Sequence, residues 1–457
     1  MPETKAFGVA GAVMLGIGSM VGAGIFIVIG QAGAIAGNIV WVSFLFGGLA
    51  ALLSGYSLAK LALRYPSRGG IVEYLVQGFG EGVFSGAAGV LFYLSQLIAI
   101  AAVAKSFGTY AATFMHGGDG MWTDVYAVGI VALFTLINLV GASLVAKSEN
   151  IIVAVKLTVL VLFAVAALFT IKPALLSASK MPGVTDMLFA IGLTFFAYQG
   201  FSVITNTVED MKDPQRNMLR SMVIAILLVA VLYVLTSVAV LGNLPLEKVI
   251  ETKDYALAEA AKPLFGELGF KIMAATALLA TASAINATLY AATEIGYSMA
   301  RDGNLPKVYE YNIFNSTEGL LVSAVLIVPM VLFFNLSQVT TVAALVVLII
   351  QGVTHVGHLF RIKETGANVW LVSGAVVSMF GIAGLTLYHT SDTMPQMGTY
   401  LLSALAFAFA VEVALRLGTK RIVSRQIVKV PEELEKEIER VIRKVHKKAD
   451  GRQTPEP

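Results

Sequence analysis

Apolar stretches of about 20 residues recur along this chain from residue 6 to residue 416, and each is long enough to cross a bilayer as an α-helix. Hydrophobic residues make up 57% of the chain, whereas charged residues make up only 13%. The mean hydropathy is +0.79. A soluble domain carries about 25% charged residues, so this chain lacks the charges that a water-exposed surface needs. The pattern therefore predicts an all-α polytopic membrane protein.

The apolar stretches predict twelve transmembrane helices, and an even number places both termini on one side of the membrane. The predicted spans are 6–35, 38–62, 79–113, 123–145, 148–171, 185–208, 217–242, 268–299, 319–335, 338–360, 367–388 and 396–416. Lysines and arginines concentrate in the loops on the N-terminal side, while the longest opposite loop mixes Lys248 and Lys253 with glutamates. The positive-inside rule then predicts a multi-pass protein of the cell membrane with cytoplasmic N- and C-termini.

The composition changes abruptly after Gly418, where charged residues replace the apolar spans. Residues from Pro431 to Lys448 place Leu434, Ile438 and Val441 at helical spacing, which predicts an amphipathic helix. We therefore expect a transmembrane domain over residues 1–417 and a charged cytoplasmic tail over residues 418–457. In the long external loop, residues 256–262 predict a short helix that ends at Pro263.

Several classes of site and partner are disfavoured by composition. The chain has no cysteine, which rules out a disulfide framework and a thiolate metal site. The net charge of +3 is spread over loops and tail without a basic block, so no nucleic-acid partner is expected. No metal ion and no cofactor is expected. The first span follows the N-terminus directly and is expected to stay as an anchor.

Lys156 is a lone cation within the apolar run from Ile151 to Phe163. A lysine at the centre of a spanning helix costs roughly 2.5–3.5 kcal/mol on insertion scales, so such residues usually face the interior and move ions or protons. The alternative is that Lys156 snorkels to the headgroups. Because it lies about a third of the way along its span, an inward-facing lysine is favoured.

The first and sixth predicted spans are interrupted by small and polar residues. Residues Gly16–Gly24 contain four glycines, and Gly200 follows Gln199 in the middle of the sixth span. One explanation is close helix packing through small residues. The other is a break in each helix, and interruptions at matching positions of two halves favour a transport site between inverted repeats. A broken helix turns its free N–H groups toward a carboxylate, and the carbonyls of a second break can accept hydrogen bonds from an ammonium group. We therefore predict broken first and sixth helices that bind a zwitterion.

Six segments together resemble the amino acid–polyamine–organocation permeases. They are Gly18–Phe26, Tyr65–Gly70, Phe195–Phe201, Glu209–Arg216, Asn286–Tyr290 and Tyr297–Pro306. Within this family the chain is most similar to prokaryotic proton-coupled amino acid transporters of broad specificity, which carry a lysine in the fifth span. The resemblance implies a five-plus-five inverted repeat, residues 6–171 and 185–361, followed by two extra helices over 367–416.

The resemblance also implies roles for individual residues. The backbone N–H groups of Gly22, Ala23 and Gly24 would bind the substrate carboxylate. The carbonyls of Phe196, Ala197 and Gln199 would bind the substrate amino group. Lys156 would replace the ion of sodium-coupled relatives, close to the carbonyl of Gly18 and the hydroxyl of Ser283, with Thr281 as the alternative to Ser283. Gln199 departs from the aliphatic residue expected there.

Other polar residues within the spans receive less specific interpretations. Gln351, His355 and His358 share one predicted span, where a packing pair is favoured over a proton relay. Asn286 is expected to form a hydrogen bond between helices. Glu294 is the second candidate for a titrating group.

These observations predict a secondary active transporter that imports amino acids with protons by alternating access, as a monomer or weak oligomer in the bilayer. No deep acidic or basic side chain is evident for a charged substrate, which favours a broad range of neutral amino acids. The alternatives are an exchanger of amino acids or amines, a sodium-coupled carrier, and a non-transporting membrane sensor or channel. An enzyme is disfavoured because the sequence contains no nucleophile–base pair or metal-ligand cluster.

Overall fold

The computed structural model describes residues 8–67, 69–115, 120–140, 143–176, 183–301, 303–314 and 316–418. Nearly all of this part of the chain is helical, as expected for a segment that must satisfy its own backbone hydrogen bonds in lipid. The predicted tail, from residue 419 onward, lies outside the described residues. The chain divides into two units, residues 1–412 and 413–457, and the following description concerns the first.

Sixteen α-helices make up the described chain. They are α1 (Val9–Ala36), α2 (Val40–Arg64), α3 (Ile71–Phe79), α4 (Val83–Met115), α5 (Gly120–Val140), α6 (Ser143–Leu168), α7 (Val184–Tyr198), α8 (Pro214–Asn243), α9 (Leu246–Glu251), α10 (Ala256–Glu259), α11 (Lys262–Arg301), α12 (Glu318–Phe333), α13 (Leu336–Phe360), α14 (Ile362–Thr365), α15 (Val369–Thr393) and α16 (Met397–Gly418). Short 3₁₀ segments are η1 (Gly37–Ile39), η2 (Pro173–Leu176), η4 (Gln199–Thr207) and η5 (Lys307–Glu310). Two-residue strands β1 (Asn312–Ile313) and β2 (Ser316–Thr317) pair antiparallel.

Ten stretches of the described chain are long and apolar enough to cross a membrane by length and composition. Val9–Gly22 and α12 are apolar but shorter. Each of the twelve predicted spans overlaps one of the helices α1 to α16. The protein is therefore an all-helical, multi-pass membrane protein.

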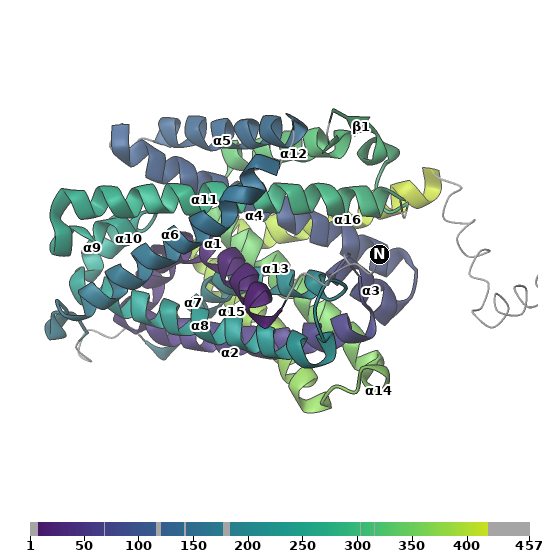
Figure 1. Ribbon diagram of the computed structural model, residues 1–457, viewed down its shortest axis with the longest axis horizontal. Coiled ribbons are helices and arrows are strands. Elements are labelled where there is room, and N and C mark those ends of the chain that lie inside the picture. The colour runs from purple at the N-terminus through teal and green to yellow at the C-terminus, as the bar shows by residue number, and fades with distance from the viewer. Residues whose placement is uncertain are drawn as a thin grey trace, which may run out of the picture. The chain divides into compact units, whose positions relative to one another are not determined.

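Helices α1 and α13 lie in the middle of the bundle, between α5 and α12 on one side and α2 and α8 on the other (Figure 1). Helix α1 packs against α7, η4, α8 and α11, while α13 packs against α2, α4, α7 and α15. Most side chains of these two central helices are buried. Polar side chains on α1 and α13 must therefore find their hydrogen-bond partners within the protein.

The start of α13 is fixed by its own sequence. The side chain of Asn335 accepts a hydrogen bond from the backbone of Gln338, and the side chain of Gln338 accepts one from the backbone of Asn335. This reciprocal pair satisfies two of the N–H groups that a helix leaves free at its first turn. This cap fixes the residue at which α13 begins.

Two sequence predictions are corrected by the backbone. The predicted break in the first span is absent, because α1 runs as one helix from Val9 to Ala36 through its glycine cluster. In the loop predicted to be external, Pro263 does not end a helix but lies in the first turn of α11, where its missing N–H costs nothing. The predicted short helix is confined to α10.

The sixth span does change conformation where the interruption was predicted. Helix α7 ends at Tyr198, and residues Gln199–Thr207 continue as the 3₁₀ segment η4. Runs of 3₁₀ helix longer than three or four residues are uncommon, and within a helix they often mark a hinge. This nine-residue run therefore places a deformable segment at the middle of the bundle.

Candidate substrate and proton-coupling site

Lys156 points into the protein and not toward the headgroups. Its side chain is 1% exposed. The Nζ atom donates a hydrogen bond of 2.7 Å to the backbone carbonyl of Gly18 on α1. Snorkelling is therefore excluded for this lysine, and the predicted contact between Lys156 and Gly18 is present.

The carbonyl that binds Lys156 also belongs to the hydrogen-bond ladder of α1. In a continuous α-helix the N–H of Gly22 donates to the carbonyl of Gly18, four residues earlier. Gly22 lies beside the ammonium group, because a Cβ atom on Gly22 would be 3.7 Å from Lys156 Nζ. Lys156 thus shares an acceptor with the first of the three residues predicted to bind a carboxylate.

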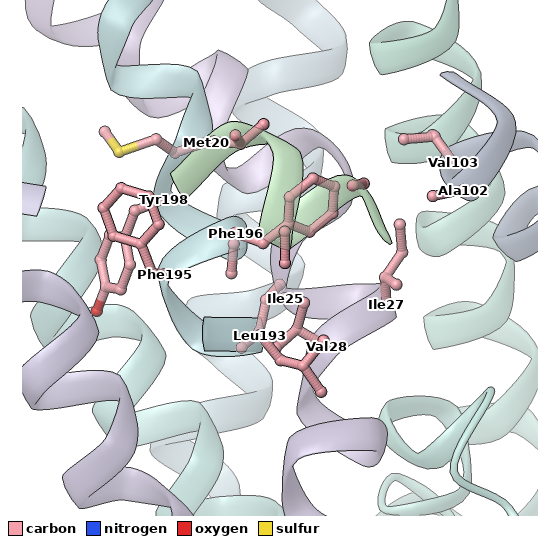
Figure 2. Packing of buried hydrophobic residues seen from close by; sticks show 14 of the residues in the cluster. Met20, Ile25, Ile27, Val28, Ala102, Val103, Leu193, Phe195, Phe196 and Tyr198 are labelled. Atoms are coloured by element: carbon pink, nitrogen blue, oxygen red, sulfur yellow. The ribbon is translucent and has the colours of Figure 1, made fainter. Parts of the chain in front are cut away.

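Glycines bring α1 into backbone contact with the sixth span. A Cβ atom on Gly24 would overlap the carbonyl oxygen of Ala197, and one on Gly200 would lie 2.6 Å from the backbone nitrogen of Met20. Figure 2 shows Met20 and Ile25 of α1 among Leu193, Phe195 and Phe196 of α7. The glycines allow the backbones of α1 and the sixth span to approach closely. This packing role accounts for the glycine cluster without a break in α1.

Tyr233 of α8 joins the same two backbones. Its hydroxyl lies 2.7 Å from the carbonyl of Met20 and 3.1 Å from that of Ala197, and it donates to both. Both carbonyls lie next to the glycine contact between α1 and α7. Tyr233 was not singled out from the sequence, since a tyrosine in an apolar helix carries no signal of the backbone groups that its hydroxyl reaches.

The residues predicted to bind the amino group lie at the end of α7. Phe196 and Ala197 are buried, and Gln199 is half-buried at the first position of η4. The side-chain oxygen of Gln199 accepts a hydrogen bond of 2.8 Å from Gln351 on α13. The glutamine found where an aliphatic residue was expected is thus held by a second glutamine.

Ser283 does not bind Lys156, contrary to the prediction. Its hydroxyl lies 2.6 Å and 2.8 Å from the two carboxylate oxygens of Glu149 on α6 and donates to them. Thr281, the alternative, donates to the carbonyl of Ala277 within its own helix. The single hydroxyl proton of Ser283 goes to this carboxylate because a hydrogen bond to a charged acceptor is stronger than a neutral one.

Glu149 is the residue that sequence reasoning missed. It precedes Lys156 by seven residues, which places the two side chains on one side of α6 about two turns apart. The carboxylate attracts the Lys156 ammonium group electrostatically. An acid seven residues before an intramembrane lysine is the sequence signal that identifies it.

Two further predictions have opposite outcomes. Asn286 of α11 accepts a hydrogen bond of 2.8 Å from Asn138 of α5, so the expected bond between helices is confirmed. Glu294 is exposed and does not face the bundle interior, so its nomination as a second titrating group was wrong.

A cavity of about 400 Å³ lies at the end of the bundle that carries the α8–α11 connection. Its lining is polar and comes from three connections between helices. The lining residues are Lys253, Asp254, Asn335, Ser337, Gln338, Thr393, Met394 and Gln396. Burial raises the pKa of Asp254 in this loop above its ordinary value.

Comparison with known proteins supports the conclusion drawn from the fold. The chain matches the family model described as "Amino acid permease" over residues 7–413. It is 34% identical over 91% of its length, and 96% of the relative's, to uncharacterized protein MJ0609 of Methanocaldococcus jannaschii. It is 39% identical to the inner membrane transport protein YbaT of Escherichia coli over 76% of this chain and 81% of that one.

A more distant relative is named for a substrate that is not an amino acid. The chain is 27% identical to the methylthioribose transporter of Bacillus subtilis, over 65% of this chain and 67% of the relative. The Escherichia coli and Bacillus subtilis relatives are named as transport proteins, and the family description names a permease, not an enzyme. The multi-pass bundle, in which the buried Lys156 contacts a glycine-rich helix, is therefore a transporter. The chain belongs to the amino acid permease family.

Proposed function

We propose that this transporter is a proton-coupled amino acid symporter working by alternating access, with Lys156 as the coupling group. The proposal includes twelve transmembrane helices, with residues 6–171 and 185–361 as inverted repeats and cytoplasmic termini. The observation that carries it is the hydrogen bond from the buried Lys156 ammonium to the Gly18 carbonyl, at the turn of α1 that ends at Gly22. A proton gained or lost there acts directly on the backbone of the substrate site.

Substrate binding requires this turn of α1 to open. In the continuous helix the N–H groups of Gly22, Ala23 and Gly24 already have carbonyl acceptors within α1. A neutral hydrogen bond contributes about 0.5–1.5 kcal/mol, whereas one to a charged group contributes about 1.5–3 kcal/mol. Exchanging three helical bonds for three to a carboxylate is therefore favourable once an amino acid is present, and glycine permits the unwound backbone.

The protonation state of Lys156 biases this opening. A charged ammonium group competes with the N–H of Gly22 for the carbonyl of Gly18, so it weakens the helix at the carboxylate site. The neutral amine is a weaker competitor, and the helical turn closes again. The protonated lysine thus favours the binding-competent site facing outward, and deprotonation toward the cytoplasm permits the return step.

The substrate amino group would be bound by the carbonyls of Phe196, Ala197 and Gln199 at the junction of α7 and η4. The side chains that the structure places around this junction, Tyr233 and Gln351 among them, are uncharged. An additional charge on the substrate would find no opposite partner there. We therefore propose neutral amino acids as substrates.

The test is uptake into proteoliposomes under an inward proton gradient, an inward sodium gradient, or neither, with a set of neutral and charged amino acids. We expect accumulation of neutral amino acids only with the proton gradient. At a membrane potential of 100 mV, one proton charge adds about 2.3 kcal/mol of driving force. Accumulation driven by sodium, or uptake that requires internal amino acid, would replace the proposal by sodium symport or exchange.

Glu149 is proposed to receive the proton that Lys156 releases. It lies about 10 Å nearer the start of α6, the end predicted to be cytoplasmic, and Ser283 holds its carboxylate in place. Glu149→Gln keeps an acceptor for Ser283 but removes the charge that attracts the ammonium group. We expect proton-driven uptake to fall about tenfold and its half-maximal external pH to move to lower values, as measured in a pH series.

Glu294→Gln is the matched control, since this exposed acid lies on α11, the helix that carries Ser283. We expect the pH profile of that variant to coincide with that of the unmodified protein. An unchanged profile in Glu149→Gln would remove Glu149 from the proton path and leave the role of Lys156 intact.

A further inference from the structure

A continuous chain of hydrogen bonds connects the sixth span to the end of α13. It contains seven side chains from four elements and is called here the histidine chain. Its members in order are Gln199 of η4, Gln351 of α13, Ser54 of α2, His355 of α13, Ser57 of α2, His358 of α13 and Thr365 of α14. The six donor–acceptor distances lie between 2.6 and 2.8 Å.

The middle of the histidine chain is sealed from solvent. Ser54, Ser57, Gln351, His355 and His358 are each 0% exposed. An unpaired polar group at such a depth costs several kcal/mol in lipid, so every proton of the chain must have an acceptor. The two ends of the histidine chain, Gln199 and Thr365, are half-buried.

These contacts fix which atom donates at each step when both histidines are neutral. The single hydroxyl proton of Ser54 goes to Gln351 Oε1, so His355 must donate to Ser54 from Nε2. The Nδ1 atom of His355 is then an acceptor, and Ser57 donates to it. Ser57 has no second proton, so His358 donates to Ser57 from Nδ1 and accepts from Thr365 at Nε2. The two histidines are therefore opposite tautomers.

The same contacts accommodate one additional proton without leaving a group unpaired. If a proton binds His358 Nε2, the Thr365 hydroxyl turns to the carbonyl of Ile362, which lies 3.2 Å away. His358 then passes its Nδ1 proton to Ser57, and Ser57 passes its own hydroxyl proton to His355 Nδ1. The charge has moved to His355, while Ser57 donates back to His358, which is neutral again with its proton on Nε2. Each step moves one proton. The only rearrangement is at Thr365, whose hydroxyl rotates so that it accepts from His358 and no longer donates to it.

We propose that the histidine chain is a second proton site, which takes up a proton at the cytoplasmic end of α13 and carries its charge to the hydrogen bond between Gln351 and Gln199. A charged His355 strengthens its donation to Ser54, and this polarises the bonds from Ser54 to Gln351 and from Gln351 to Gln199. Internal pH would thereby act on η4, the deformable segment of the sixth span. The proposal goes beyond the coupling role of Lys156 and does not depend on it.

Two groups near the histidines oppose a positive charge on them. They are Lys60 of α2, which acts on His358, and His358 itself, which acts on His355. The other charged residues near the outer end belong to α14 and its start, where Arg361 pairs with Glu364 and Tyr65 donates to Glu364. No acid of the described residues contacts the two histidines, so a bound proton is not held by a fixed counter-charge and can move along the chain.

The first test is nitrogen NMR of the whole protein with ¹⁵N-labelled histidine, assigned with His355→Gln and His358→Gln. We expect a protonated Nε2 at His355 and a protonated Nδ1 at His358 at neutral pH, and a single shared titration of the two on acidification. Two identical tautomers, or two independent titrations, would overturn the proposal. This readout needs no substrate.

The second test is the rate of uptake into proteoliposomes at fixed external pH, with internal pH lowered in steps from about 8 to about 5, which covers and extends below the midpoint of an unperturbed histidine. We expect the unmodified protein to change its rate by about fivefold or more, the lower end of coupling between two sites. His355→Gln and Thr365→Val should lose this response while still transporting. Thr365→Val alters only the half-buried end, so it keeps the test valid if the buried variant fails to fold.

The matched control is Thr354→Val, which removes a hydroxyl on the same buried stretch of α13 that donates only to its own helix. We expect this variant to keep the response to internal pH. Equal responses in Thr354→Val, His355→Gln and Thr365→Val would show that the histidine chain serves packing alone.

Discussion

Lys156→Ala is expected to abolish proton-driven accumulation of amino acid while leaving downhill exchange measurable. The substitution removes the side chain that is hydrogen-bonded to the carbonyl of Gly18, so the hydrogen bond to Gly22 no longer responds to a proton. Proteoliposomes loaded at equal internal and external substrate concentrations should then show no net uptake under a pH gradient. Lys156→Arg should be equally uncoupled, because an arginine stays charged at every pH of the cycle.

Lys105 supplies the matched control for a buried lysine. It lies on α4, is 7% exposed and forms an ion pair with Asp124 of α5. A lysine paired with a carboxylate has a structural counter-charge, whereas Lys156 is bonded to a neutral carbonyl. Lys105→Ala is expected to destabilise the protein by about 3–5 kcal/mol, because it leaves a partly buried carboxylate unpaired. The folded fraction of this variant should still accumulate amino acid to the same ratio as the unmodified protein. Wild-type accumulation in Lys156→Ala would contradict the coupling role.

The apolar pattern was sufficient to place the helices that cross the membrane. A segment in lipid must satisfy its backbone hydrogen bonds within itself, so length and hydropathy nearly determine its structure. The short helices α3, α9 and α14 were not predicted, because nothing comparable constrains a segment at the membrane surface. The change from α7 to η4 at Gln199 was predicted from glycine and polar residues in the middle of the span.

The partner of Ser283 could not be predicted from local pattern. Ser283 and Lys156 were expected to meet through the resemblance to known permeases, and the contact depends on how α6 and α11 are rotated. The structure turns Ser283 toward Glu149, which lies at the start of the predicted span 148–171 and was not singled out from the sequence. The histidine chain was underestimated for a similar reason, since Ser54 and Ser57 look like ordinary small residues of α2 until α13 is packed against them.

The four glycines of residues 16–24 illustrate why one pattern supports two structures. Glycine weakens a helix by about 1 kcal/mol per residue relative to alanine, which favours a break. Glycine also lets a neighbouring backbone approach, which favours an intact helix when such a neighbour exists. The structure provides that neighbour at Ala197, so the helix remains continuous. The choice depends on the facing helix, about which residues 16–24 contain no information.

Gly24→Ala is expected to destabilise the protein strongly, although alanine is the better helix former. The new Cβ atom would overlap the carbonyl oxygen of Ala197 and lie 2.8 Å from its Cα atom, and a backbone cannot rotate away as a side chain can. Overpacking of this kind costs about 1–3 kcal/mol, and separating α1 from α7 also stretches both hydrogen bonds of Tyr233. Thermal unfolding in detergent should show a lowered midpoint, and substrate uptake should be lost in the protein that survives.

Gly381→Ala on α15 separates this effect from helix propensity. A Cβ atom on Gly381 would meet nothing within 4 Å, so the substitution should stabilise the helix by up to about 1 kcal/mol and leave transport unchanged. If Gly24→Ala matched Gly381→Ala in both unfolding and uptake, α1 and α7 would not be in backbone contact in the working protein. Lys156, Gly22 and Ala197 can form one site only with that contact, because the amino and carboxylate groups of an amino acid are joined through a single carbon. Both ends of the substrate can be bound together only if the two backbones lie as close as Gly24 allows.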